Sequence, residues 1–349
     1  MQRQIDGPAR EGPKPDVQPD HWALLAVTRF LLASLIVAGH ARFQLTDLAA
    51  RDASAIARSL GGGVAVIGFL VISGFSIAHS VQQPRGFYAR RFARIWPTLA
   101  LSTALFAGLI WTFHRAGRPD PTGPQVAAVL LFLNGLVVTN WFGPTWSLSV
   151  EALFYAFAPL LRRTPTELFA ALVALSAAIH WEIVRLGVSS YPDAMHGRTP
   201  AGLFWVWGLG FLVFRERRNP LWGLVLWLGG GVLIWRFNPE GGAWWPLTWT
   251  AVVMVVAFGG SLRLRWPGLR RAFNYLGDLS YPMFLLHMPV FFLLGGLGLR
   301  HGLLGALAVL AASAACLHWL DRPLRAHVAL ALERVGARLR RRLWPARAA

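Results

Sequence analysis

Long apolar runs, separated by short polar connections, cover most of the chain. A helix needs about 20 consecutive apolar residues to cross the hydrocarbon core of a bilayer. We predict apolar segments at residues 22–40, 62–80, 96–114, 124–139, 147–161, 167–186, 201–214, 220–236, 243–260, 278–299 and 303–320. The pattern therefore predicts an all-α protein that crosses a membrane many times.

Arginines gather in the connections that follow alternate segments, and short basic connections usually lie in the cytoplasm. These arginines are Arg85, Arg90, Arg91, Arg94, Arg162, Arg163, Arg215, Arg217, Arg218, Arg263, Arg265, Arg270 and Arg271, followed by the basic stretch 334–342. Three apolar segments lie between Arg94 and Arg162, and three crossings cannot return the chain to the same side. Segment 124–139 is short and is followed by the turn-forming sequence TNWFGPTW. We therefore predict that it is a re-entrant or peripheral helix, which leaves about ten crossings and places both termini in the cytoplasm.

The distribution of polar residues divides the chain into three parts. Residues 1–21 are charged and rich in proline, without an apolar core or a cleavage-site pattern. We expect a disordered cytoplasmic tail there and not a signal peptide. Residues 22–325 form the predicted membrane domain, and residues 326–349 form a basic cytoplasmic tail.

Composition supports this interpretation and narrows the partners. The chain of 349 residues is 55% hydrophobic and only 14% charged, against about 25% charged in soluble domains. A net charge of +18 would point to nucleic acid in a soluble protein, but here the arginines flank apolar spans. We expect a lipid bilayer as partner and no nucleic acid. Cys316 is the single cysteine, and without a metal-ligand spacing of Cys or His we expect no metal site.

The stretch RFLLASLIVAGH at residues 29–40 carries a cation at one end and an imidazole at the other. Eleven helical positions come within about 20° of three whole turns, so Arg29 and His40 share a helix face about 16 Å apart along the axis. An ionisable residue within a span usually faces the protein interior. The alternative is that both side chains extend to their nearest membrane interface.

Two further arginines lie three residues apart in FYARRFARIWP, residues 87–97. We predict a short helix ended by Pro97, with Arg91 and Arg94 on one face. Paired guanidinium groups suit a phosphorylated ligand. The competing interpretation is that they only anchor the chain on the cytoplasmic side.

Small and acidic residues interrupt two other spans. Ser73 and Gly74 lie in the middle of segment 62–80, where they either allow close helix packing or contact a ligand. Glu151 begins an apolar helix, and Tyr155 follows one turn later on the same face. A carboxylate in a membrane needs a partner, and one that hydrogen-bonds an imidazole prepares it to act as a general base. His40 and Arg29 are both available as partners, and we expect Glu151 to orient His40.

The stretch LGDLSYPMFLLHMPV at residues 276–290 places His287 between two prolines. We expect Pro282 and Pro289 to interrupt the helix and to free backbone groups that face a cavity. A histidine in such an interrupted span is a candidate functional residue.

Taken in order along residues 22 to 325, these segments resemble the acyltransferase-3 family of integral membrane acyltransferases. The resemblance rests on Arg29 and His40, on SGF at 73–75, on Arg91 and Arg94, on WSLSVE and FY within 146–155, on LSYPMFLLHMPV at 279–290 and on DRPLR at 321–325. Each motif is weak alone, and their order makes the set specific.

The resemblance implies transfer of an acyl group, commonly acetyl, from cytoplasmic acyl-CoA to a hydroxyl of a glycan, a lipid-linked sugar or another carbohydrate-like acceptor. It implies that His40 is catalytic, that Arg29 is essential and that Arg91 and Arg94 bind the donor. Acyl-CoA is then a co-substrate, and no bound cofactor is expected. The family often has two consecutive acidic residues where this chain has Glu151 and Ala152, which puts the role of Glu151 in question.

The resulting hypothesis is a multi-pass enzyme of the bacterial cytoplasmic (inner) membrane in which His40 removes the proton of the acceptor hydroxyl. We expect a cavity lined by Ser73, Gly74, Trp146, Tyr155, Tyr281 and His287. An acyl-histidine intermediate is an open alternative to direct transfer. A glycan or lipid transporter would also suit about ten spans. A passive scaffold would leave the costly polar groups within the spans without a purpose. The acceptor and the oligomeric state stay open.

Overall fold

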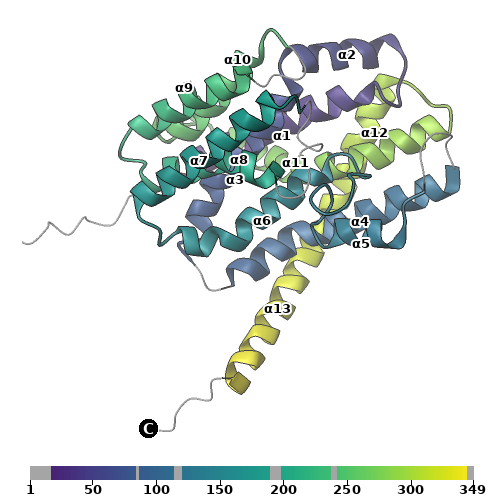
Figure 1. The fold of residues 1–349 in the computed structure, drawn as a ribbon. Coiled ribbons are helices and arrows are strands. Elements are labelled where there is room, and N and C mark those ends of the chain that lie inside the picture. The colour runs from purple at the N-terminus through teal and green to yellow at the C-terminus, as the bar shows by residue number, and fades with distance from the viewer. Residues whose placement is uncertain (1–16, 84–85, 114–119, 189–197, 237–241, 344–349) are drawn as a thin grey trace, which may run out of the picture.

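The computed structural model describes residues 17–83, 86–113, 120–188, 198–236 and 242–343, and these form helices joined by short connections (Figure 1). The first helices are α1 (Pro19–Ala41), α2 (Leu48–Ser59), α3 (Gly62–Ser80), α4 (Phe87–Phe113), α5 (Gly123–Leu130), α6 (Thr145–Leu161), α7 (Thr166–Arg185) and α8 (Arg198–Arg215). They are followed by α9 (Leu221–Arg236), α10 (Trp245–Val253), η2 (Met254–Phe258), η3 (Gly259–Ser261), α11 (Pro267–Gly296), α12 (Gly302–Ala315), η4 (Cys316–Asp321) and α13 (Arg322–Leu343). The described residues contain no strand, which agrees with the predicted all-α class.

The helices are long and apolar enough for a multi-pass membrane protein. Six of those in the described residues are candidate membrane spans: α1, α3, α4, α7, α11 and the continuous helical stretch Gly302–Val328. Shorter apolar helices lie at α6, at α9 and at Trp245–Ser261. Each predicted crossing segment coincides with one of these helices or with α8. The number of crossings and the side on which the termini lie stay predictions.

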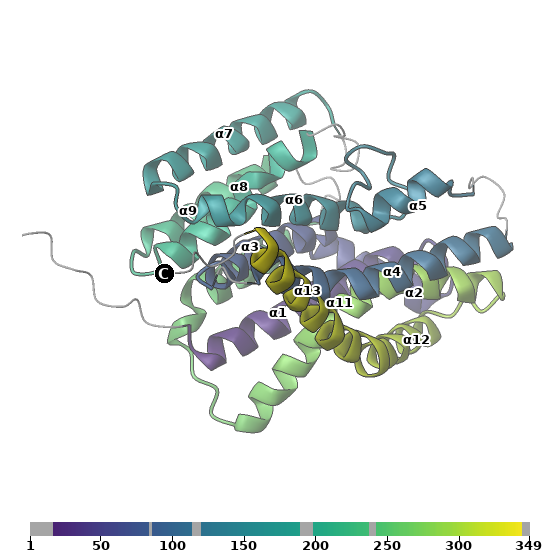
Figure 2. The ribbon, with the colours of Figure 1, turned by 90° about the horizontal axis from the view of Figure 1, so that it is seen from below.

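The bundle places α1, α3 and α11 at its centre, with α7 and α9 on one flank and α12 on the other (Figures 1 and 2). Helix α1 packs against both α11 and α3, and α3 packs against α8. Aromatic side chains fill the core around α8, where Phe214 packs against Phe75 of α3 and where Trp205 and Trp207 are fully buried. The central helices are therefore the ones that can hold polar side chains away from lipid.

The segment predicted not to cross, 124–139, folds as the eight-residue helix α5 followed by a loop. Eight residues rise about 12 Å, far less than the hydrocarbon core of about 30 Å. The loop is fixed by Asn134, whose side-chain amide donates to Asn140 Oδ1 at 2.6 Å and to Thr145 Oγ1 at 2.7 Å. The short length of α5 supports the expectation of a re-entrant or peripheral helix.

The prediction that Pro97 ends a short helix is wrong. Helix α4 continues through Pro97 to Phe113. A proline inside a helix removes one backbone donor and crowds the preceding turn, but neighbouring helices in a bundle compensate. Pro97 is buried against them, and the hydroxyl of Tyr281 on α11 donates to the carbonyl of Ile95 at 2.6 Å. Arg91 and Arg94 therefore lie on the first turns of a long span.

The expected interruption at Pro282 and Pro289 is also wrong, because both prolines lie within the continuous helix α11. The hydroxyl of Ser280 donates to the carbonyl of Gly277 at 2.7 Å, on the turn before the first proline. Close packing on α1 holds the helix together here, since a Cβ on Gly277 would overlap Ala26. His287 is thus carried by an unbroken helix.

Glycines set the distance between α3 and α8. A Cβ on Gly74 would overlap the carbonyl oxygen of Trp207, and a Cβ on Gly210 would overlap the carbonyl oxygen of Val71. Small residues allow helix backbones in membranes to approach this closely. Of the two interpretations of Gly74, close packing is the one that its position supports.

The DRPLR motif joins the last helix to the bundle. Asp321 is 1% exposed, accepts a hydrogen bond from the hydroxyl of Thr98 at 3.0 Å and forms an ion pair with Arg325. Arg322 forms an ion pair with Asp278 of α11 at 2.9 Å. Helix α13 then projects away from the bundle (Figure 1). It extends to Leu343, so the predicted basic tail is helical as far as that residue. Most of the predicted N-terminal tail, residues 1–16, lies outside the described residues.

Candidate active site

A cavity of about 910 Å³, with the open solvent at its mouth included, lies between α1, α3, α4, α6 and α11. Its polar lining residues are Arg29, Ser73, Ser76, Arg91, Arg94, Ser147, Glu151, Tyr155, Ser280 and Tyr281. Seven of them, from five separate segments of the chain, were candidate site residues from the sequence alone. The fold brings these segments together around one space.

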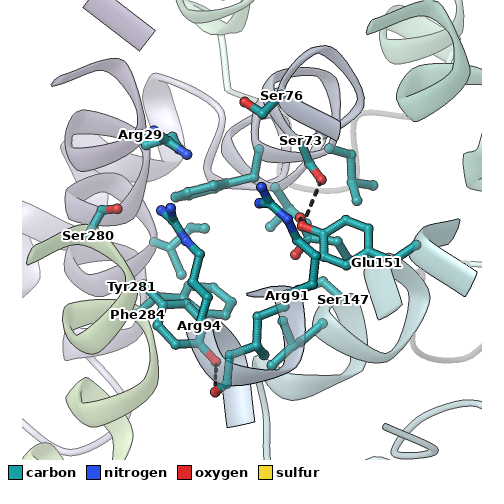
Figure 3. Close-up of a pocket in the computed structure, with 17 residues that line it drawn as sticks. Arg29, Ser73, Ser76, Arg91, Arg94, Ser147, Glu151, Ser280, Tyr281 and Phe284 are labelled. Atoms are coloured by element: carbon teal, nitrogen blue, oxygen red, sulfur yellow. Dashed lines mark hydrogen bonds between the residues drawn. The ribbon is translucent and has the colours of Figure 1, made fainter. Parts of the chain in front are cut away.

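Three guanidinium groups face this cavity, from Arg29, Arg91 and Arg94 (Figure 3). The lining also contains one carboxylate, that of Glu151. Three positive charges and one negative charge give the lining a net charge of two positive units. The Nε atoms of Arg29 and Arg91 are buried and have no hydrogen-bond partner. Buried donors without a partner are costly. The cavity is therefore suited to an anionic ligand that accepts hydrogen bonds.

The position of Arg91 is fixed by a contact outside the lining. Its Nη2 donates to the hydroxyl of Ser80, at the end of α3, at 2.8 Å. This contact orients the guanidinium group between α3 and α4 before any ligand binds. Preorganised donors of this kind bind a planar or tetrahedral anion with little loss of side-chain freedom.

Glu151 contacts Tyr155 and not His40. The hydroxyl of Tyr155 donates to Glu151 Oε1 at 2.5 Å, and the hydroxyl of Ser73 lies 3.2 Å from the same tyrosine oxygen. Because Tyr155 donates to the carboxylate, Ser73 is the donor in the second bond. The contact expected between Glu151 and His40 is absent from the described residues, because Glu151 lies beside the arginines and His40 lies further along α1.

The partner of His40 is His287. Nδ1 of His40 lies 2.9 Å from Nε2 of His287, and the two rings stack with centroids 5.2 Å apart and planes 11° apart. One ring must donate and the other accept, so the tautomer of one imidazole determines the tautomer of the other. Nε2 of His40 is then the ring nitrogen that the pair leaves for a substrate.

The histidine pair lies one turn beyond the cavity. Ile36 and Phe284 line the cavity, and His40 and His287 follow them by four and three residues on their helices. Residues three or four apart share a helix face. Phe69 packs against Phe284 with ring centroids 6.0 Å apart. An apolar ring of Ile36, Phe69 and Phe284 therefore stands between the guanidinium groups and the histidines.

Three of the predicted cavity residues lie elsewhere. Gly74 packs against α8, Trp146 is buried beside Gly135, and His287 pairs with His40. Tyr281 lines the cavity as expected and donates to a backbone carbonyl of α4. The sequence analysis missed the lining serines Ser76, Ser147 and Ser280. Ser76 could have been found, because it follows Ser73 by three residues on the same face of α3.

Among the residues that the structure describes, no group of three His, Cys, Asp or Glu side chains is placed to hold a metal ion. The two polar clusters of the site are instead a set of guanidinium groups and a pair of imidazoles. Such groups bind anions and transfer protons.

Comparison with protein families gives one match over most of the chain. A family model described as an acyltransferase domain matches residues 23–320. This range begins within α1 and ends within η4, so it contains both the cavity and the histidine pair. No solved structure matches the chain.

Two curated relatives match parts of the chain. The acyltransferase MdmB of Streptomyces mycarofaciens is 36% identical over 113 residues, which is 29% of this chain and 29% of that protein. The putative membrane-bound transacylase BcsY of Komagataeibacter xylinus is 26% identical over 265 residues, which is 66% of each chain. The chain thus spans less than a third of the first relative and just under two thirds of the second.

Proposed function

We propose, on the premise that this chain belongs to the acyltransferase-3 family of integral membrane acyltransferases, that it transfers an acyl group from acyl-CoA to a hydroxyl of a carbohydrate-like acceptor. The observation that carries this proposal is the order of groups along α1 and α11. A cluster of guanidinium groups lies at one end, an apolar ring follows, and a histidine pair lies at the other end. A donor with an anionic head and a long neutral arm fits this order.

The proposed donor site is the set of guanidinium groups of Arg29, Arg91 and Arg94, which we call the cation cluster. Arg91 and Arg94 hold phosphate oxygens of CoA, because the guanidinium fork matches their geometry and the cavity has excess positive charge. Arg29 lies in the same cluster, about 16 Å along the helix from His40. That separation favours a role for Arg29 in holding the donor over direct stabilisation of charge at the reacting carbonyl.

The histidine pair is the proposed catalytic group. Nε2 of His40 accepts the proton of the acceptor hydroxyl while the hydroxyl oxygen attacks the thioester carbonyl carbon. A C–O bond forms, the C–S bond breaks, and the thiolate of CoA leaves and takes up the proton from Nε2 of His40. His287 holds the ring of His40 through the 2.9 Å contact and is a positioning residue. Attack by His40 itself, giving an acyl-histidine intermediate, uses the same geometry.

The acceptor is proposed to approach from the end of the bundle that carries His40. The loop after α1 and the helix α2 lie at this end, and by the distribution of arginines it is the outer face of the membrane. A glycan or lipid-linked sugar outside the bacterial cytoplasmic membrane would meet a donor that enters from the cytoplasm. Names of relatives support acyl transfer but do not fix the acceptor.

Transfer of label from radioactive acetyl-CoA by the purified protein in lipid nanodiscs tests the proposal. We expect loss of acetyl-CoA and labelling of a sugar acceptor, and we expect His40→Ala to abolish both while the protein still folds and inserts. A His40→Ala variant with full transfer at equal expression would disprove the mechanism. Movement of a glycan across the membrane without consumption of acetyl-CoA would favour a transporter instead.

A further inference from the structure

A second pocket lies next to the cavity, where α3 and α8 end and where α6 connects to α7. Its space is about 1550 Å³ with the open solvent at its mouth included, and its lining includes Gln82, Arg162, Arg163, Arg215, Glu216 and Arg217. We call these six residues, the further lining residue His79 and the space between them the basic pocket. None of them belongs to the cation cluster or to the histidine pair.

The basic pocket has excess positive charge and a fixed wall. Four arginines and one glutamate leave three positive charges. Nη1 of Arg215 donates to the carbonyl of Thr164 at 2.8 Å, and its Nε donates to Glu216 at 3.3 Å. Glu216 also accepts a hydrogen bond from the hydroxyl of Thr166 at 2.9 Å. Arg215 and Glu216 thus join α8 to α7, while Arg163 is exposed.

The basic pocket and the cavity share two helices. Tyr155 on α6 lines the cavity, and Arg162, the residue that directly follows α6, lines the basic pocket. Seven residues come within about 20° of two turns, so both side chains lie on one face about 10 Å apart along the axis. On α3, Ser76 lines the cavity and His79 lines the basic pocket. A single ligand can therefore follow the same faces from one space into the other.

Arg91 lies at the boundary between the two spaces. It lines the cavity, and its Nη2 contacts Ser80, the residue after His79 of the basic pocket. Positive charge consequently continues from Arg162 and Arg163 through Arg91 to the guanidinium cluster. A ligand with phosphate groups at two places along its length matches this distribution.

We propose that the basic pocket binds the 3′-phosphoadenosine end of the CoA donor, with the pyrophosphate beside Arg91 and the arm of the donor in the cavity. This inference rests on the proposed function. Arg162 and Arg163 supply guanidinium groups to the 3′-phosphate. The side-chain amide of Gln82, at the same rim, offers hydrogen bonds to a base edge. The nucleotide is thereby held outside the membrane helices and only the arm enters them.

Binding of nucleotide fragments tests this site without any turnover. Calorimetric titration of the full chain, in nanodiscs of neutral lipid, would compare adenosine 3′,5′-bisphosphate with adenosine 5′-monophosphate. We expect the bisphosphate to bind about tenfold more tightly. We expect the double substitution Arg162→Gln and Arg163→Gln to remove that preference. Equal binding of the two nucleotides to the unaltered protein, or no loss in the double variant, would overturn the proposal.

Arg218→Gln is the matched control. Arg218 is exposed, follows Arg217 directly and does not line the basic pocket. The substitution Arg218→Gln removes one positive charge from the same end of the bundle. An effect of net charge alone would therefore appear in this variant as well as in the double variant. Arg215 is unsuitable for this test, because it joins α8 to the α6–α7 connection. We expect Arg218→Gln to keep the preference for the bisphosphate, and an equal loss in the control would overturn the assignment.

Kinetics with truncated donors separates this inference from the proposed function. We expect the KM for acetyl-CoA to rise about tenfold in the double variant and the KM for 3′-dephospho-acetyl-CoA to stay unchanged. Equal rises for both donors would overturn the placement of the 3′-phosphate. A protein that binds the bisphosphate through Arg162 and Arg163 but transfers no acetyl group would disprove the proposed function and leave this site in place.

Discussion

Nδ1 of His40 lies 2.9 Å from Nε2 of His287, although 247 positions separate the two residues in the chain. The contact joins α1 to α11, the two helices that also carry Arg29 and Tyr281 into the cavity. His287 is fully buried, and its side chain forms a hydrogen bond with the imidazole of His40. The pair therefore gives His40 the orientation that a general base needs.

Substitution of His287 should slow transfer without weakening donor binding. We expect His287→Ala to lower kcat about 10- to 100-fold and to leave the KM for acetyl-CoA nearly unchanged. His287→Gln should recover part of the rate, because the glutamine side chain can place a polar atom near the position of Nε2. Steady-state kinetics of the two variants checks this, and equal losses in both would argue for a purely structural role.

Substitution of an arginine in the cation cluster should act on the donor. Arg94→Ala removes a guanidinium group from the cavity, so we expect the KM for acetyl-CoA to rise about tenfold or more. Arg90→Ala is the matched control on the same helix, because Arg90 does not line the cavity and donates to the carbonyl of Gln83. Similar KM values for the two variants would contradict the proposed donor site.

Glu151 and Tyr155 should behave as a coupled pair. Their 2.5 Å hydrogen bond predicts that Glu151→Gln and Tyr155→Phe each destabilise the protein, and that the double variant loses less than the sum. A hydrogen bond to a charged group contributes about 1.5–3 kcal/mol. Thermal unfolding of the four proteins in detergent measures the coupling, and strictly additive losses would show that the bond contributes nothing.

Substitution of Glu151 also tests which residue orients the catalytic base His40, Glu151 or His287. Because Glu151 contacts Tyr155 and not His40, we expect Glu151→Gln to keep the shape of the pH–rate profile. His287→Gln should change that shape, because it replaces the direct partner of His40. A profile altered by Glu151→Gln and unaffected by His287→Gln would restore the carboxylate as the group that orients His40.

Glycine contacts between α3 and α8 should limit stability. Gly74→Ala and Gly210→Ala place a methyl group against a backbone carbonyl of the facing helix, so we expect each to cost about 1–3 kcal/mol or more. Gly108→Ala on α4 has no heavy atom within 4 Å of the added methyl group and should be neutral or slightly stabilising. The fraction of protein that elutes as a monodisperse species after heating compares the three variants.

Asp47 gives a pH dependence outside the spans. Its carboxylate accepts hydrogen bonds from the backbone amides of Gly302 and Ala50, at 2.9 Å and 3.0 Å, and these bonds lower its pKa below the usual value of 3.8. A lowered pKa means that the contribution to stability is present above the unfolded pKa and is lost as the pH falls through the folded one. We expect Asp47→Asn to lower the unfolding temperature at pH 7 and to have less effect below about pH 4.

The matched control for this prediction is Asp52→Asn. Asp52 lies on α2 close to Asp47 and is exposed. Unfolding temperatures of both variants and the unaltered protein would be measured from pH 7 to pH 3. A difference between Asp47→Asn and the unaltered protein that stays constant over this range would contradict the role given to the carboxylate.

The sequence by itself determined the local features of the molecule. Apolar runs predicted the helices and the short non-crossing segment, because length and hydropathy are properties of the segment alone. The helical period placed Arg29 and His40 on one face and grouped Arg91 with Arg94. Even the resemblance to a family rested on motifs that can be recognised one segment at a time.

Only the tertiary structure decided which of these residues meet. It gave His40 the partner His287 and gave Glu151 the partner Tyr155, against the expected contact between His40 and Glu151. It also showed that α4 and α11 continue as helices past the prolines within them. The physical reason is common to these cases. A side chain's partner, and a helix's tolerance of proline, depend on how neighbouring helices are rotated and packed, and no single segment contains that information.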